Sequence, residues 1–283
     1  MIGAIIGDIV GSRFEFNNRR SKEFRLFAEG CYATDDSVLT LAVGKALMKA
    51  GKAAPREGPG RGAGFYEALS DLTVKNMRDI GRRYPDRGYG GMFARWLFSR
   101  SPKPYRSYGN GAAMRVSPAG LASADEQDAM LLAEAVTRVT HDHPEGIKGA
   151  QAVALAIHMA RTGASQGEIR VRISREFYPL DFTIDAIRDS YVFNETCQET
   201  VPQAVECFLE SNSFEDAIRT AVSLGGDSDT VAAICGSIAE AYYGVPADLK
   251  SKALGYLDDW LRAICDQWEA FAPEPRTAAR GTA

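Results

Sequence analysis

The stretch GGDSDT (residues 225–230) lies directly before an apolar run over residues 231–239. The pattern predicts a loop that becomes the first turn of a buried helix, because Ser, Asp and Thr side chains accept hydrogen bonds from the free backbone N–H groups there. One capping residue is enough to start a helix, whereas this stretch supplies two carboxylates and a hydroxyl. Buried carboxylates must be paired or bind a metal ion. We therefore expect a second acidic group to meet this one.

A second acidic stretch, TDDS (residues 34–37), also precedes an apolar helical pattern. If the two helix starts meet, four Asp and two Thr side chains face one another, and the carboxylates repel strongly at low dielectric constant. Divalent cations remove that repulsion, and all-oxygen ligands select Mg²⁺, Mn²⁺ or Ca²⁺ over Zn²⁺. Four carboxylates match the charge of two such ions. The alternative is a pair of ordinary helix N-caps with exposed Asp side chains.

The rest of the pattern predicts an all-α chain. Gly3, Gly7 and Gly11 recur every four residues, which places them on one face of a helix over residues 2–12 and lets another backbone approach closely. Asp8 in this helix is expected to cap or pair. Further helices are predicted over residues 38–50, 65–80, 92–100, 125–139, 146–162, 165–177, 183–193, 199–210, 213–223, from the 225–230 stretch to 243, and 246–271. Strand-like alternation is limited to a short hairpin pattern around residues 24–33.

We expect one domain over residues 1–271, because no linker or internal repeat divides the chain. Residues 272–283 are expected to form a disordered tail. Residues 13–33 and 52–64 are the expected lids of a site. Their arginines would steer an anionic substrate or form a solvated basic surface. These arginines are Arg13, Arg19, Arg20, Arg25, Arg56 and Arg61.

Composition argues against several classes of protein. The 283 residues carry a net charge of -4, which leaves no overall basic surface for nucleic acid. No run of about 18 apolar residues is present to span a membrane. The apolar N-terminus lacks a basic segment and contains Asp8, so it is a poor signal peptide. The 5 cysteines are widely spaced without a C-x-x-C pattern, which indicates free thiols. We expect a cytoplasmic monomer.

Six motifs follow one another from residue 3 to about residue 244. They are GAIIGDIVGSRFE (3–15), TDDS (34–37), RGYGG (87–91), SYGNGAAMR (107–115), THDHPEGIKGA (140–150) and GGDSDT (225–230). In order and spacing they resemble the ADP-ribosylglycohydrolase family, the ADP-ribosyl-acceptor hydrolases that include the dinitrogenase-reductase-activating glycohydrolases. The resemblance implies a compact all-α orthogonal helical bundle around a dinuclear Mg²⁺ or Mn²⁺ centre at helix N-termini.

The resemblance also implies roles for individual residues. Six positions match the metal-binding segments of the family: Thr34, Asp35, Asp36, Asp227, Asp229 and Thr230. Glu15 matches the acidic residue that acts near the reacting sugar, so Glu15, Asp35 and Asp229 are expected to be catalytic. Six further positions match residues that contact the substrate: Gly91, Ser107, Tyr108, Gly109, Asn110 and His141.

The chemistry of the residues supports these roles unevenly. Glycine loops with free N–H groups suit a diphosphate, because a backbone without Cβ can approach it closely, yet RGYGG fits a simple turn equally well. Tyr108 or Tyr89 would stack on adenine or pack in the core or rim. His141 would donate to a phosphate or ribose, or serve only as a hydrogen-bonding loop residue.

The implied reaction cleaves the bond at the anomeric carbon of the distal ribose, between ADP-ribose and a protein side chain, through an oxocarbenium-like transition state. Two metal ions would fix the ribose hydroxyls and orient a water. Glu15 would polarise the leaving atom, assist the water or stabilise the cationic sugar. Family members cleave N-glycosidic bonds on arginine, or O-linked bonds on serine, O-acetyl-ADP-ribose and poly(ADP-ribose). The RGYGG and SYGNGAAMR motifs resemble the O-linked branch.

Two other functions stay open on the sequence alone. One is a dinuclear Mg²⁺ enzyme that cleaves a diphosphate bond in a prenyl diphosphate or a nucleotide. The absence of a D-D-x-x-D run after Asp35 counts against the prenyl type. The other is a non-catalytic ADP-ribose-binding protein, since a fold does not fix a function. The presence of Glu15 and of every expected metal position counts against it.

Overall fold

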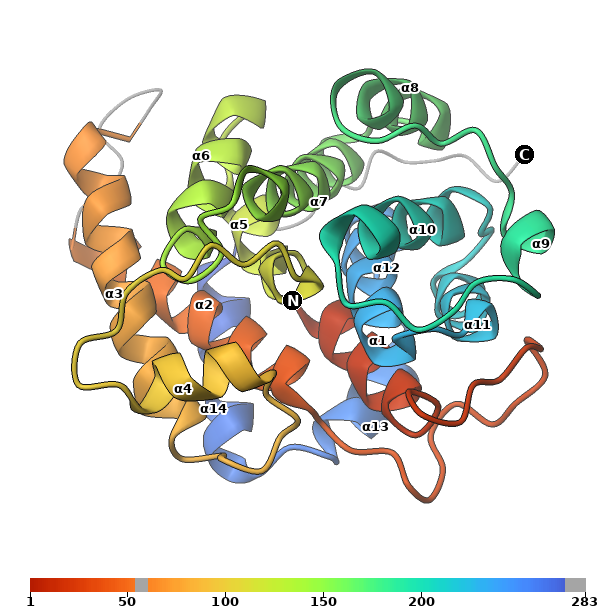
Figure 1. Cartoon of the computed structure of the whole chain (residues 1–283), viewed down its shortest axis with the longest axis horizontal. Coiled ribbons are helices and arrows are strands. Elements are labelled where there is room, and N and C mark those ends of the chain that lie inside the picture. The colour runs from red at the N-terminus through yellow and green to blue at the C-terminus, as the bar shows by residue number, and fades with distance from the viewer. Residues whose placement is uncertain (54–60, 273–283) are drawn as a thin grey trace.

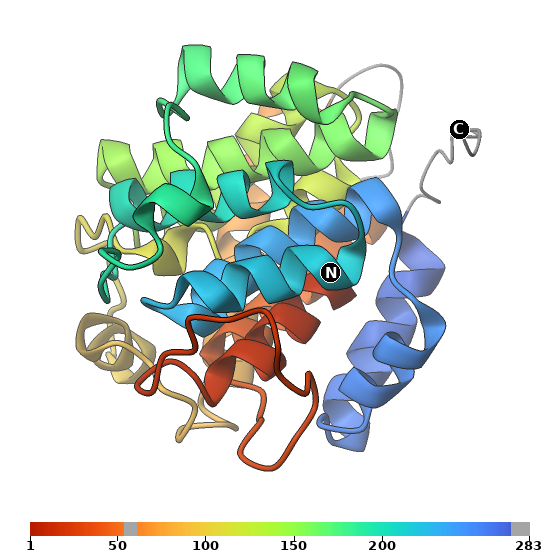
Figure 2. The same ribbon diagram turned by 90° about the vertical axis from the view of Figure 1, so that its right-hand side faces the viewer.

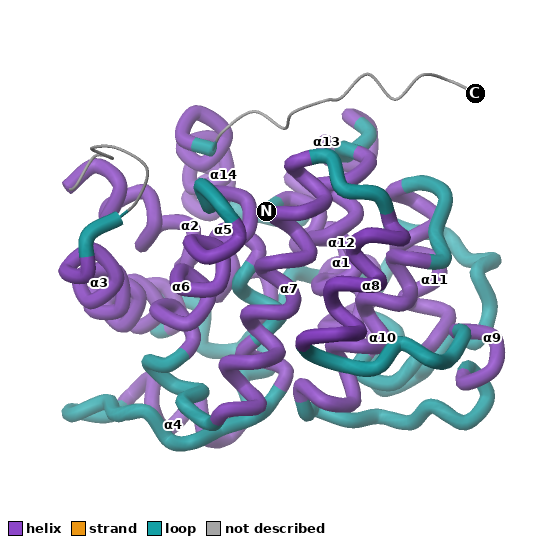
Figure 3. Tube along the Cα trace, turned by 90° about the horizontal axis from the view of Figure 1, so that it is seen from above, coloured by secondary structure: helices purple, strands orange, loops and turns teal. Residues whose placement is uncertain are grey.

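The computed structural model describes residues 1–53 and 61–272, which form fourteen α-helices and one 3₁₀ turn. The described residues contain no strand and only one isolated bridge, between Gly109 and Thr196 (Figure 3). The helices are α1 (Ile2–Ser12), α2 (Asp35–Ala53), α3 (Ala63–Gly81), α4 (Gly91–Phe98), η1 (Asn110–Ala112), α5 (Ser117–Ala122), α6 (Glu126–Thr137), α7 (Pro144–Thr162), α8 (Gln166–Glu176), α9 (Ile184–Ile187), α10 (Cys197–Leu209), α11 (Phe214–Leu224), α12 (Ser228–Tyr243), α13 (Ala247–Leu254) and α14 (Asp259–Phe271). The all-α prediction is confirmed.

Helices α1 and α12 lie side by side in the middle of the molecule and run antiparallel (Figure 1). A Cβ atom added to Gly3 or Gly7 would overlap the carbonyl oxygen of Gly236 or Ala232, and one added to Gly11 would lie 2.5 Å from the Cα of Asp229. The close backbone approach expected from the glycine spacing is therefore present. It fixes the end of α1 directly against the start of α12.

The remaining helices enclose this central pair. Helix α12 packs against α7, α10 and α11, and α2 packs against α3, α5 and α14. Helices α13 and α14 lie along one side of the molecule, where they contact α1 and α2 (Figure 2). No helix of the described residues is both long and apolar enough to cross a membrane.

Two predicted helices are wrong in extent. The helix expected over residues 183–193 ends as α9 at Ile187, because the carbonyl oxygens of Arg188 and Tyr191 accept hydrogen bonds from the Arg20 guanidinium at 2.6 Å. The helix expected over residues 246–271 is divided into α13 and α14. Asp258 interrupts it, because its side chain accepts from the Leu261 N–H at 2.9 Å and caps α14.

The loop predictions are corrected at three places. The pattern around residues 24–33 forms turns and no strand. Residues 117–122, for which no helix was predicted, form α5, with a proline in its first turn. Helices α2 and α3 extend into both ends of the loop expected over residues 52–64, of which residues 54–60 lie outside the described part. The tail residues 273–283 also lie outside it.

The α1–α12 contact predicts a sharp difference between two glycine substitutions. Gly7→Ala places a methyl group on the Ala232 backbone, which cannot move away cheaply, so we expect a loss of about 3 kcal/mol in the free energy of unfolding. Gly64→Ala in α3 is the matched control, because no atom lies within 4 Å of its added Cβ, and it should gain up to about 1 kcal/mol from helix propensity. Urea unfolding measures both. Equal stability of the two variants would contradict the close contact.

Candidate active site

One cavity of about 720 Å³ lies between the starts of α2, α4 and α12. All thirteen residues that the sequence singles out as metal-binding, catalytic or substrate-binding line it. They are Glu15, Thr34, Asp35, Asp36, Gly91, Ser107, Tyr108, Gly109, Asn110, His141, Asp227, Asp229 and Thr230. Segments that are far apart in the chain therefore meet at one place, as the expected site requires.

The two acidic helix starts meet inside this cavity. The Thr230 hydroxyl at the start of α12 donates to a carboxylate oxygen of Asp36 at the start of α2, at 3.3 Å. The Asp36 N–H donates to the Thr34 hydroxyl oxygen at 3.2 Å, and the Thr230 N–H donates to Asp229 at 3.0 Å. All four side chains are buried. The alternative of two separate caps with exposed aspartates is therefore excluded for Asp36 and Asp229.

Helix α1 holds the start of α2 through Asp8. The buried Asp8 carboxylate accepts hydrogen bonds from the Thr34 hydroxyl at 2.7 Å, from the N–H groups of Thr34 and Ser37 at 3.0 Å, and from the Ser37 hydroxyl. Burial raises the pKa of Asp8 to about 6, although these hydrogen bonds oppose the rise. The sequence predicted that Asp8 would cap or pair, and the structure confirms it. Asp8 thereby fixes the TDDS stretch relative to α1.

The aspartates at the two helix starts have raised pKa values. Burial raises the pKa values of Asp35, Asp36, Asp227 and Asp229, and neighbouring carboxylates raise those of Asp35, Asp36 and Asp229 further. One carboxylate oxygen of Asp36 is buried without any hydrogen-bond partner. Such a group is costly unless a cation binds it. The side chains that converge here offer only oxygen ligands, which suit a hard divalent cation.

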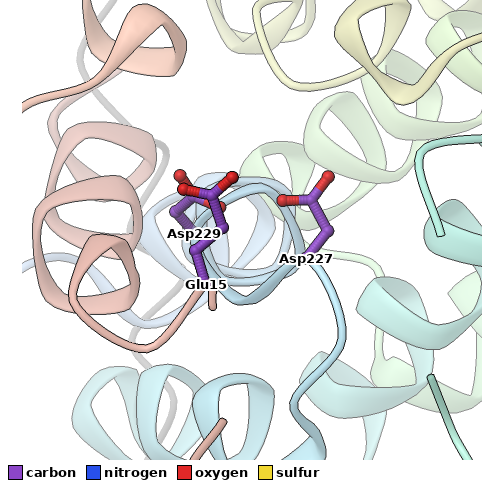
Figure 4. Close-up of side chains that lie close together, drawn as sticks. All are labelled: Glu15, Asp227 and Asp229. Carbon is purple, nitrogen blue, oxygen red and sulfur yellow. The ribbon is translucent and has the colours of Figure 1, made fainter. Parts of the chain in front are cut away.

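Three carboxylates come close enough to share one ion. Ligand oxygens of Glu15, Asp227 and Asp229 lie within 4.8 Å of one another. Figure 4 shows these carboxylates directed to the same side at the start of α12. Asp35 is not part of this group of three, and its N–H donates to the Arg87 carbonyl oxygen at 2.7 Å. This group of carboxylates at the α12 start could therefore bind a metal ion.

Glu15 lies at the end of α1 on a loop that is fastened to the start of α12. Its side chain is half-buried, and burial, followed by the charges of Asp227, Asp8 and Glu195, raises its pKa to about 7. The Asn18 amide donates to the Glu15 carbonyl oxygen at 3.1 Å and to the Gly226 carbonyl oxygen at 2.9 Å, and it accepts from the Gly226 N–H at 2.8 Å. Sequence reasoning could not identify Asn18, because its partner is 208 residues away.

The arginines expected to steer an anion are largely engaged within the chain. The Arg20 guanidinium donates to the carbonyl oxygens of Arg188, Tyr191 and Leu224. The Arg61 guanidinium pairs with the Asp128 carboxylate at 3.0 Å, and both side chains are buried. We therefore correct the prediction that Arg20 and Arg61 steer an anionic substrate: both have a structural role. Arg13 and Arg19 donate to backbone carbonyl oxygens within their own loop, and Arg56 lies outside the described residues.

The SYGNG loop lines the cavity opposite the α2 start. The Asn110 amide donates to Asp227 at 2.7 Å and to the Thr200 hydroxyl at 3.2 Å, so it connects this loop to the acidic cluster. The Ser107 hydroxyl accepts from the Gly109 N–H at 3.1 Å. These contacts hold the SYGNG loop against the acidic cluster.

The two tyrosines considered for adenine stacking differ in position. The Tyr108 side chain lines the cavity and is about half-exposed. Tyr89 does not line it, and its hydroxyl donates to the Gly81 carbonyl oxygen at 3.4 Å. Of the two, only Tyr108 is therefore placed to contact a bound base.

His141 is a buried, neutral donor that faces the cavity. Its Nδ1 lies 2.8 Å from the Thr140 hydroxyl and 3.4 Å from the Arg115 guanidinium. Burial and the Arg115 charge hold the pKa of His141 well below its usual range. Because Arg115 can only donate, Nδ1 acts as the acceptor and the proton resides on Nε2. That nitrogen would lie 3.4 Å from a Cβ added to Gly111, beside the SYGNG loop.

Comparisons with known proteins agree with this geometry. A family model described as ADP-ribosylglycohydrolase matches residues 1–278. ADP-ribosylhydrolase ARH3 of Homo sapiens is 27% identical over 90% of this chain and 88% of that protein. ADP-ribosylarginine hydrolase Tri1 of Pseudomonas putida is 28% identical over 87% of this chain and 70% of its own length. ADP-ribosyl-[dinitrogen reductase] glycohydrolase of Rhodospirillum rubrum is 25% identical over 91% of this chain and 88% of its own.

A comparison of folds agrees with the sequence comparisons. A solved structure, an ADP-ribosylglycohydrolase-related protein complex, superposes with a TM-score of 0.64 over 96% of this chain and 97% of its own. Its identity of 22% makes this a likeness of fold alone. The helical architecture, the cavity lined by the thirteen predicted site residues and the family match over residues 1–278 lead to one conclusion. The chain belongs to the ADP-ribosylglycohydrolase family, and it is a glycosidase-type hydrolase that removes ADP-ribose from conjugates.

Proposed function

We propose that the chain is a metal-dependent hydrolase that releases ADP-ribose from modified protein side chains by cleavage at the anomeric carbon of the distal ribose. The observation that carries the proposal is the position of Glu15. Its half-buried carboxyl lies in the same cavity as the acidic cluster, on the loop that follows α1. A carboxyl at this place can pass a proton between a water and the leaving atom, as a general acid or base must.

The cofactor in this proposal is a pair of divalent cations, Mg²⁺ or Mn²⁺. Thr34, Asp35 and Asp36 on one helix start and Asp227, Asp229 and Thr230 on the other would hold them. When bound, the cations would neutralise the buried carboxylates, orient the ribose hydroxyls and acidify a water. Asp35 and Asp229 count as catalytic residues through this role. The unpartnered oxygen of Asp36 and the all-oxygen donor set support the assignment.

The chain's own residues would carry the rest of the reaction. The water oxygen forms a bond to the anomeric carbon while the bond from that carbon to the acceptor atom breaks. One proton of the water passes to the acceptor, with Glu15 as its carrier. The Nε2–H of His141 would donate a hydrogen bond to a phosphate or ribose oxygen, and the free N–H groups at the start of α4, near Gly91, would bind the diphosphate. Asn18 holds the Glu15 loop against the start of α12.

The proposal also covers the type of bond that is cleaved, that is, whether ADP-ribose is attached to serine or to arginine. Among the relatives, the P. putida protein is named for ADP-ribosylarginine and the R. rubrum protein for ADP-ribosylated dinitrogen reductase. The RGYGG and SYGNGAAMR motifs favour an O-linked substrate. We therefore place a serine-linked ADP-ribose first and an arginine-linked one second.

Incubation with matched peptides tests the reaction itself. In the presence of Mg²⁺, we expect intact ADP-ribose from a serine-modified peptide and slower release from an arginine-modified one. EDTA should abolish release, as should Asp229→Ala. Chromatography of the products is the measurement. AMP as the product would indicate pyrophosphate cleavage instead, and full activity after metal removal would rule out the metal-dependent mechanism.

Metal binding should also be visible as stability that depends on pH. In EDTA, the folded chain retains protons on Asp35, Asp36 and Asp229 that the unfolded chain releases above about pH 4, so stability should fall as the pH rises toward 7. A cation replaces those protons, so its stabilising effect should grow over the same range. At pH 7 we expect a rise in Tm of about 5 °C with saturating Mg²⁺ or Mn²⁺. Thermal unfolding measures this rise. If the metal raised the Tm of Asp229→Asn as much as that of the unaltered chain, the account would be refuted.

A substitution of Glu15 separates its proposed proton transfer from the binding of ADP-ribose. Glu15→Gln preserves shape but cannot exchange the proton, so kcat should fall on the order of 100-fold or more while the affinity for ADP-ribose is kept. Glu23→Gln on the same loop is the matched control, because Glu23 is exposed and does not line the cavity. Turnover kinetics and calorimetric binding of ADP-ribose distinguish the outcomes. If binding is lost together with turnover, Glu15 positions the ligand and does not carry a proton.

A further inference from the structure

An exposed apolar surface lies next to Glu15, outside the cavity lining. Phe16 is 84% exposed, and its ring stacks on that of Phe193 with centroids 6.1 Å apart and an interplanar angle of 26°. Val192, adjacent in the chain, is 68% exposed. We name Phe16, Val192 and Phe193 the aromatic lip. Single exposed apolar residues are ordinary on a protein surface, whereas a stacked aromatic pair drawn from two distant segments needs a reason.

The two loops that form the aromatic lip are braced against each other. The Arg20 guanidinium reaches from the first loop to the carbonyl oxygens of Arg188 and Tyr191 on the second, both at 2.6 Å. The Tyr191 ring packs against Gly226, and its hydroxyl donates to the Glu199 carbonyl oxygen at 2.6 Å. These contacts hold the two loops that carry the lip against each other. A contact surface that is already ordered loses little entropy when a partner binds.

The position of the lip relative to the cleaved bond indicates what it would contact. Phe16 directly follows Glu15, and Phe193 precedes Glu195 by two residues, while Glu15 and Glu195 both line the cavity. In the proposed function the bond to be broken lies beside Glu15, and ADP-ribose fills the cavity. An acceptor group that extends from that bond past Glu15 would reach the lip, because Phe16 and Phe193 lie one and two residues from the cavity-lining Glu15 and Glu195.

We propose that the aromatic lip binds the polypeptide that carries the modified side chain, through an apolar residue close to the modified one. This inference rests on the proposed function and adds a substrate requirement to it. A second copy of the chain fits less well, because a stable dimer interface buries roughly 1,200–2,000 Å² in total, far more than three side chains supply. An anionic membrane fits less well too, because the residues around the lip carry both charges: Asp189 and Glu195 are exposed, and so is Arg19.

The test compares two substrates that differ only beyond the cleaved bond. One is an ADP-ribosylated peptide with a leucine beside the modified residue, and the other is the ADP-ribosylated amino acid alone. In Phe16→Ser/Phe193→Ser, kcat/KM for the peptide should fall about ten-fold, mainly through KM, as expected for loss of an aromatic contact. The value for the amino acid conjugate should change less than about two-fold, because neither ring lines the cavity.

Val171→Ser is the control for loss of an exposed apolar residue. Val171 is 63% exposed on α8 and does not line the cavity, so its substitution should leave both substrates unaffected. All substituted side chains are exposed, and the Tm of each variant should match that of the unaltered chain. A peptide with glycine in place of leucine should reproduce, with the unaltered enzyme, the loss seen in the double variant.

Each alternative outcome has a distinct signature. An equal loss for the peptide and the amino acid conjugate would show that the lip supports the Glu15 loop only, and it would overturn the inference. No loss for either substrate would overturn it as well. Loss of self-association in the double variant, with unchanged kinetics, would assign the lip to a second copy of the chain. Failure of the unaltered chain to release ADP-ribose from either conjugate would reject the proposed function itself.

Discussion

Three glycines of α1 lie directly against the backbone of α12, and the positions of the acidic residues depend on that contact. Gly11 touches the backbone at Asp229, which brings the end of α1 to the start of α12. Asp8, one turn earlier on α1, holds the start of α2 through hydrogen bonds to Thr34 and Ser37. A single central helix thus aligns two helix starts that are almost 200 residues apart in the chain. The alignment rests on the backbone contacts between α1 and α12 and on the hydrogen bonds of the Asp8 carboxylate.

The carboxylates that gather at this point are of two kinds. Asp8 has a full set of donors around it, which compensates for its burial and marks it as a structural group. Asp36 retains a buried oxygen without a partner, and it lies close enough to Asp35 and Asp229 for the negative charges to repel. Repelling buried carboxylates of this kind are typical of places that bind a group of opposite charge. The contrast separates Asp8, which stabilises the fold, from the aspartates that we propose as cation ligands.

The sequence alone could predict what depends on local pattern and composition. The glycine spacing in residues 2–12 indicated a close helix pair, and the similar composition of TDDS and GGDSDT indicated that two helix starts meet. It could not predict Asn18 or the use of Arg20, because their partners lie in segments some 170–210 residues away. The same distant contacts ended α9 early, against its local helical pattern. The division between α13 and α14 at Asp258 was missed because a residue that caps one helix also occurs within others.

The central claim is that the starts of α2 and α12 together bind two divalent cations. Crystals of the chain grown with Mn²⁺ and measured for anomalous scattering test it most directly. The account predicts two anomalous peaks in the cavity, one or both in contact with Asp36 and Asp229, and their loss in Asp36→Asn. An empty cavity at saturating Mn²⁺, or peaks that persist in that variant, would contradict it.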